Sequence, residues 1–152
     1  RDDRPMRIAF GTDEVTPVTA AIEAHLAAAG HEVVPAGAGD PWPDVGRRVG
    51  EAVASGEADR GVVCCWTGTG VSIAANKVPG VRAALCVDAE TARGARRWND
   101  ANVVALGLRL TSTTAAGEVL DAFLGNETVD PDEAANIARV EPGAGAGAAP
   151  GA

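Results

Sequence analysis

Blocks of apolar residues alternate along this chain with blocks whose apolar positions repeat at helical spacing. Five short runs that are apolar almost throughout predict strands buried on both faces of a sheet. We expect these strands at residues 6–10, 31–35, 60–65, 81–86 and 103–106. Apolar positions three or four apart predict helices at residues 15–29, 44–54, 71–76, 89–98 and 111–124. Strands that alternate with helices are typical of an α/β fold, in which helices cover both faces of a parallel sheet.

The length of 152 residues suits one α/β domain and is too short for two ordinary ones. We place this domain at residues 6–140. The charged segment 1–5 and the Gly/Ala/Pro-rich segment 141–152 lack periodicity, so a disordered extension is expected at each end. Acidic residues and a proline at 130–133 predict the start of a last helix that runs to residue 140, because helix N-termini favour both.

The segment from Cys64 to Lys77 carries the clearest chemical signal. Cys65 ends a predicted strand, and the glycine-rich stretch Thr67–Gly70 leads from it into a helix. Backbone N–H groups in such a turn can hold an anion or a developing oxyanion, and the thiol beside them can act as a base or nucleophile. The alternative interpretation is an ordinary strand–helix turn with a packed cysteine. Side chains alternate along a strand, so Cys64 is expected to face the other side, as a small buried hydrophobe like Cys86.

Two further polar clusters are expected at the same edge of the sheet. Asp13 and Glu14 follow the first strand, and Arg109 follows the last one. In parallel α/β sheets, ligands bind beyond the carboxyl ends of the strands. These residues are therefore candidates for a site shared with Cys65.

Charge and composition exclude several classes of function. The formal net charge of −8 argues against nucleic acid and anionic membrane as partners, since both need a basic face. We identify no signal peptide and no apolar run of the roughly 18 residues that a transmembrane helix needs. Three cysteines, two of them adjacent, give no disulfide framework, so a reducing cytoplasm is expected. With two histidines and no CxxC spacing, we expect no metal site.

Four sequence blocks together resemble one known family. They are residues 56–61, residues 65–72, residues 73–82, and residues 99–103 with Gly107 and Arg109. From about residue 7 to 140 the chain is similar to the ribose-5-phosphate isomerase B family, which includes galactose-6-phosphate isomerase subunits. The resemblance implies a Rossmann-like three-layer sandwich with a five-stranded parallel sheet. It also implies a homodimer with the C-terminal helix exchanged between the two copies, and a tetramer is the open alternative.

The resemblance also assigns roles to residues. It implies that Cys65 moves a proton between C1 and C2 of a sugar through an enediolate, without a cofactor. Thr67 and the turn amides would hold the negative oxygen, and Asn99 would assist. Trp98 and Asn99 enter the site through the resemblance only, because they precede the last strand. The expected substrate-binding residues are Asp13, Trp66, Gly68, Thr69, Gly70, Ser72, Trp98, Arg109 and Arg139.

Several positions depart from the family pattern. Glu14 stands where the family has a phosphate-binding histidine, and Trp98 stands where it has a histidine that assists ring opening. Indole cannot exchange protons near neutral pH. Trp66 replaces a glycine and Trp42 replaces a tyrosine. Without the first histidine the site binds a phosphate dianion less well, and without the second it has no residue to assist the opening of a cyclic sugar.

The C-terminal phosphate-binding element of the family is also reduced. Ala135 and Asn136 occupy the places of an arginine and a histidine, and only Arg139 remains. The alternative is a shifted alignment, or replacement by another arginine such as Arg93, Arg96 or Arg97.

These observations predict a sugar isomerase of aldose–ketose type that acts on an open-chain or non-phosphorylated substrate. Glu14 is a candidate acid/base because a desolvated carboxyl can be tuned toward neutrality, although it can equally be a solvated loop residue. Two other hypotheses stay open. The chain can be an ordinary ribose-5-phosphate isomerase whose missing contacts come from elsewhere, or a non-catalytic sugar-binding subunit.

Overall fold

A computed structural model describes residues 4–125, 127–141 and 143 of the chain. The remaining residues of the two expected extensions lie outside this part. The strands are β1 (Arg7–Thr12), β2 (Glu32–Ala38), β3 (Arg60–Cys65), β4 (Ala83–Leu85) and β5 (Val103–Gly107). The helices are α1 (Pro17–Ala28), α2 (Trp42–Ala54), α3 (Thr69–Asn76), α4 (Ala89–Asn99), α5 (Thr113–Leu124), the 3₁₀ turn η1 (Pro131–Glu133) and α6 (Ala134–Val140).

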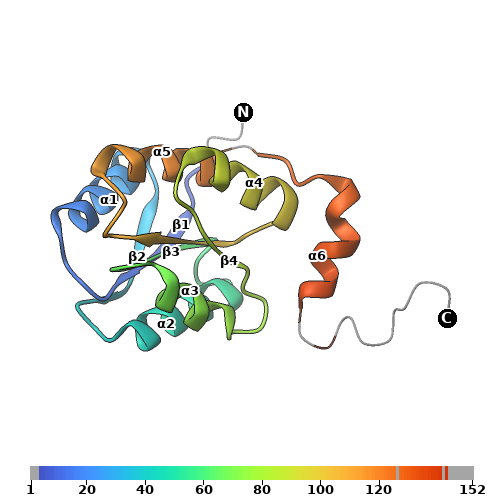
Figure 1. The fold of residues 1–152 in the computed structure, drawn as a ribbon, viewed down its shortest axis with the longest axis horizontal. Helices are drawn as coiled ribbons and strands as arrows, with labels where there is room; N and C mark the ends of the chain where they lie inside the picture. Colours follow the sequence, from blue (N-terminus) through green and yellow to red (C-terminus); the bar gives the residue numbers. More distant parts are fainter. Residues whose placement is uncertain (1–3, 126, 142, 144–152) are drawn as a thin grey trace.

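The five strands form one parallel sheet in the order β2-β1-β3-β5-β4. Helices α1, α4 and α5 cover one face of this sheet, and α2 and α3 cover the other (Figure 1). The α/β fold with a five-stranded parallel sheet is therefore confirmed. Helix α6 stands beside the sheet rather than on either face, and none of its residues is buried (Figure 1).

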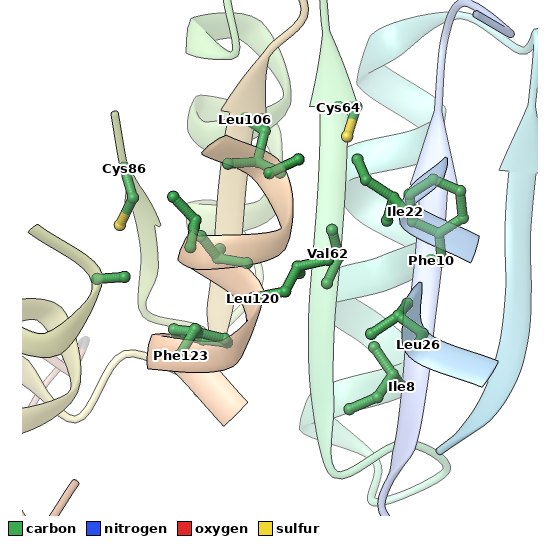
Figure 2. Close-up of a cluster of buried hydrophobic side chains, with 14 of the residues drawn as sticks. Ile8, Phe10, Ile22, Leu26, Val62, Cys64, Cys86, Leu106, Leu120 and Phe123 are labelled. Carbon is green, nitrogen blue, oxygen red and sulfur yellow. The ribbon is translucent and has the colours of Figure 1, made fainter. Parts of the chain in front are cut away.

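After Arg60, strand β3 is buried and apolar because it lies at the centre of the sheet and its side chains enter both cores. Val62 and Cys64 point into the core beneath α1 and α5, together with Phe10 and Leu106 (Figure 2). Val63 and Cys65 alternate with them and point into the core beneath α2 and α3. This alternation places the two neighbouring thiols on opposite faces, as expected.

Most elements differ from their predicted bounds by one to three residues, and for two of them the structure gives the reason. Strand β4 has three residues rather than six. It starts later than predicted because the N–H of Arg82 binds the side-chain oxygen of Asn102 at 2.8 Å and not a neighbouring strand. The last helix is split into η1 and α6, since the Asp130 carboxylate accepts a hydrogen bond from the Asp132 N–H and tightens the first turn. Glu141, which we expected to begin a disordered tail, binds the body of the domain through its carboxylate.

In the described ranges, no helix combines the length and the apolar character required to cross a bilayer. The same residues contain no group of three or more His, Cys, Asp or Glu side chains arranged to hold a metal ion.

Candidate active site

Cys65 is the last residue of β3 and pairs with Gly107, the last residue of β5. Its side chain lies at the carboxyl edge of the sheet, where α3 begins. The Gly68 N–H donates to the Cys65 sulfur at 3.2 Å. A backbone donor stabilises a thiolate more than a thiol, and so does the positive end of a helix. The geometry therefore favours Cys65 as the reactive thiol of the pair.

Cys64 lies in a different environment. It is fully buried among apolar side chains from α1 and β5 (Figure 2). Burial raises the pKa of its thiol far above the ordinary value, and the neighbouring Cys65 and Asp13 raise it further. Cys64 is therefore a neutral packing residue.

The glycine-rich turn rests directly on the end of β5. Gly68 has a φ of 78°, a left-handed conformation that glycine adopts without strain. A Cβ built on Gly68 would lie 2.8 Å from the Gly107 nitrogen, and one built on Gly107 would lie 2.6 Å from the Thr67 oxygen. Both positions thus need glycine for the backbones to approach. The turn leads straight into α3, whose first N–H groups lack partners within the helix and point outward.

Two hydroxyl groups accompany these amides. The side-chain oxygens of Thr67 and Thr69 lie 2.7 Å apart, within hydrogen-bond distance. Both threonines are exposed, whereas Ser72 is half-buried one turn further along α3. The turn therefore offers an amide donor at the Cys65 sulfur and two hydroxyl groups on the residues that flank Gly68.

Asp13 and Glu14 occupy different environments after β1. The Asp13 N–H binds the Cys64 carbonyl at 3.2 Å, which places Asp13 beside the end of β3. Its Oδ1 atom is buried and has no hydrogen-bond partner in the described part of the chain. Desolvation raises the pKa of the Asp13 carboxyl, although nearby backbone N–H groups oppose the shift. Glu14 is exposed. Asp13 is thus the better-placed carboxyl for a ligand's hydroxyl group.

Two tryptophans and one arginine lie at this edge of the sheet. The ring of Trp42 covers Gly70, since a Cβ built there would lie 2.9 Å from ring carbons. Trp66 is 53% exposed, and its carbonyl accepts a hydrogen bond from the Arg109 N–H at 2.8 Å. Arg109 is exposed at the same edge of the sheet. The sequence identified Trp42 as a departure but did not include it among the site residues, because its contact with Gly70 is long-range.

Asn99 and Trp98 are not brought to this turn within one chain. They end α4, which leads to the first residue of β5, and the partner of that residue on β3 is Gly61. From Gly61 to Cys65 the strand spans roughly 13 Å at about 3.3 Å per residue. Trp98 and Asn99 instead line a groove beside α4, together with Leu85 of the edge strand β4.

Arg139 is also separate from the turn. It is exposed on α6, beyond the edge of the sheet (Figure 1). The residues predicted for the site therefore fall into two groups in one chain, one around Cys65 and one at the end of α4 and on α6.

Comparisons with known proteins agree in family and in fold. The model of the ribose/galactose isomerase family matches residues 8–141. The chain is 43% identical over 124 residues to the galactose-6-phosphate isomerase subunit LacB of Clostridium acetobutylicum, covering 78% of this chain and 72% of that protein. A D-erythrulose-4-phosphate isomerase of Pectobacterium atrosepticum is 42% identical over 93 residues, covering 61% of each chain.

One solved structure is similar to this chain over nearly the whole length of both proteins. Ribose-5-phosphate isomerase B of Clostridium thermocellum superposes with a TM-score of 0.84 at 40% identity, covering 89% of this chain and 95% of that one.

Proposed function

We propose that this chain, which belongs to the ribose/galactose isomerase family, interconverts an aldose and a ketose with Cys65 as the base. The observation that carries the proposal is the position of the Cys65 sulfur, 3.2 Å from the Gly68 nitrogen at the start of α3. There the sulfur has a backbone donor and a helix N-terminus to stabilise its thiolate.

The proposed reaction is a proton transfer between neighbouring carbons. The Cys65 thiolate takes the proton from the carbon beside the carbonyl, and the electron pair moves onto the carbonyl oxygen. The turn amides and the Thr67 hydroxyl stabilise the resulting enediolate, since preorganised donors act where charge develops. The hydroxyl proton on the neighbouring oxygen passes to the former carbonyl oxygen, and the C=C electron pair takes the proton back from the thiol at the former carbonyl carbon. A carbonyl thereby forms at the carbon that lost its proton, so that no external oxidant or reductant is needed. Asp13, which lies beside the end of β3 and is half-buried, binds a hydroxyl group of the substrate with its carboxylate.

A second copy of the chain completes the site. Asn99 and Arg139 lie away from Cys65 in their own chain but are exposed, and α6 has no buried residue. A helix that buries nothing on its own domain gains stability by packing on a neighbour. Its apolar residues Ala134, Ile137 and Ala138 supply a stripe for that contact.

Light scattering should therefore give a mass of about 30 kDa at micromolar concentration, twice the 15.2 kDa of the chain. Truncation before Pro131 should shift the protein toward the monomer, because it removes η1 and α6. A full-length monomer under these conditions would show that α6 does not exchange between copies.

The residues proposed for the site favour a short substrate that does not form a ring. Ring opening needs a group that exchanges protons, and Trp98 cannot supply one. A ketose of four carbons with its terminal oxygen phosphorylated has no free hydroxyl that can close a ring on its carbonyl. One similar protein is named for such a substrate, D-erythrulose 4-phosphate. Arg109 and Arg139 remain as cations for a single phosphate, against the carboxylates of Asp13 and Glu14.

The test compares the isomerisation of D-erythrulose 4-phosphate with that of ribose 5-phosphate. We expect the four-carbon substrate to react and the cyclic pentose phosphate to react weakly or not at all. Ribose 5-phosphate turnover of about 10 per second or more, as in ordinary enzymes, would favour the alternative of an ordinary ribose-5-phosphate isomerase. Binding of both compounds without turnover of either would favour a non-catalytic subunit.

A further inference from the structure

Arg82 joins two segments that are far apart in the sequence. It directly precedes β4, and its side chain is 19% exposed. Its Nη1 donates to the Glu141 carboxylate at 2.6 Å, and its Nε donates to the Asp100 carbonyl at 2.8 Å. Its Nη2 lies 3.4 Å from the Asp100 carboxylate. One guanidinium therefore holds the segment after α4 and the segment after α6 together.

The two residues that Arg82 holds are neighbours of expected site residues. Asp100 follows Asn99 directly, and Glu141 lies two residues after Arg139. Both belong to the part of the site that a second copy would complete. The planar guanidinium suits this arrangement because its five donors point in fixed directions, which an ammonium cannot match.

The carboxylates around Arg82 are fully engaged. Glu141 also accepts the Gly80 N–H at 3.0 Å, so each of its two oxygens has a partner. The other oxygen of Asp100 accepts from Arg96 at 2.8 Å. Asp100 itself has a φ of 47° and ends α4 in the left-handed conformation that Asp adopts more readily than most residues other than glycine. A cap residue whose side-chain and main-chain oxygens are all held is a fixed support for Asn99.

We infer that Arg82 is a positioning residue that fixes both Asn99 and Arg139 in the direction from which they reach the partner's Cys65. The inference rests on the proposed function, since it assumes that these two residues act in a second copy. Glu141 transmits the effect to α6 only, and Asp100 transmits it to the end of α4 only. The two effects can therefore be separated by substitution.

The test uses Arg82→Met, Glu141→Ala and the control Arg47→Met in the full chain. Arg47 forms exposed ion pairs with Asp44 and Glu51 on α2, away from both segments. In Glu141→Ala, we expect faster amide hydrogen exchange in residues 134–141 and at Gly80, whose N–H the carboxylate accepts, but not in residues 98–102. We also expect KM to rise about tenfold, the effect of losing one charged hydrogen bond.

In Arg82→Met, exchange should also rise in residues 98–102, and kcat should fall as well by about tenfold, since Asn99 is released too. Arg82→Lys should not restore the wild-type exchange rates, KM or kcat, because lysine keeps the positive charge but lacks the planar set of N–H donors.

Unchanged exchange of both segments in Arg82→Met would overturn the inference. So would a KM for Glu141→Ala equal to that of Arg47→Met. Glu141→Ala does not alter the hydrophobic core, so it still tests the link between Arg82 and α6 if Arg82→Met fails to fold. If the wild-type protein turns over no sugar phosphate, the proposed function fails. In that case the amide exchange rates and the dissociation constant of the dimer test whether Arg82 fixes the two segments. A dissociation constant that is unchanged in both Arg82→Met and Glu141→Ala would overturn the inference.

Discussion

Replacing Cys65 by serine should lower the rate of proton exchange at the reacting carbon by about two to four orders of magnitude, the usual contribution of a positioned base. A serine hydroxyl keeps the shape of the thiol but does not ionise near neutral pH. The Gly68 N–H that now meets the sulfur at 3.2 Å would then face a neutral group. Incorporation of solvent deuterium into the substrate, followed by NMR, measures this step apart from product release.

Cys64→Ala is the matched control, because it removes the adjacent thiol from the opposite face of β3. Deuterium exchange should stay close to the wild-type rate, while the melting temperature falls through lost packing. Equal rates in the Cys65→Ser variant and the wild type would mean that the base lies elsewhere. Asp13, whose carboxylate has an oxygen without a hydrogen-bond partner in the described residues, would then be the next candidate for the base, followed by Glu14.

Gly68→Ala should destabilise the protein by about 2–5 kcal/mol, combining left-handed strain with overpacking. The added methyl group would lie 2.6 Å from the Leu85 side chain and 2.8 Å from the Gly107 nitrogen. The backbone cannot move away without shifting the end of β5. Turnover should also fall by about 10²–10³, as expected when an oxyanion donor is displaced. Urea unfolding and steady-state kinetics measure the two effects.

Gly56→Ala isolates the contribution of the clash. Gly56 has a φ of 82°, close to the 78° of Gly68, but a Cβ built on it would meet no atom within 4 Å beyond its chain neighbours. This control should lose only the left-handed strain of about 1–2 kcal/mol and no activity. If Gly68→Ala cost no more than Gly56→Ala, the turn would have room to shift, and its close packing on β5 would not be essential.

Most of the fold follows from local pattern. Strand β3 was predicted to the residue because residues 61–65 form an uninterrupted buried run, and the alternation of its side chains correctly assigned Cys64 and Cys65 to opposite faces. The cluster at the carboxyl edge followed from parallel topology, since Asp13 and Arg109 come after strands that flank β3. These features depend on neighbours in sequence or on strand direction, which a sequence pattern records.

The remaining features depend on contacts that no local pattern records. The buried oxygen of Asp13 and the exposure of Glu14 come from the turn after β1, where the two carboxyl groups look equivalent in sequence. The anchoring of Glu141 depends on Arg82, which lies 59 residues earlier. Asn99 was assigned to the site by resemblance, and only the register of β3 with β5 places it at the far edge of its own chain.

The alternation of side chains along β3 also governs how the protein responds to oxidants. A disulfide requires two sulfurs that approach closely, and Cys64 and Cys65 point into different cores. Cys86 shares the core of Cys64, so the chain's three cysteines include no resolving thiol for Cys65. A sulfenic acid formed at Cys65 would therefore stay open to further oxidation or to rescue by an external thiol. The arrangement that frees this sulfur for proton transfer thus leaves it without protection inside its own chain.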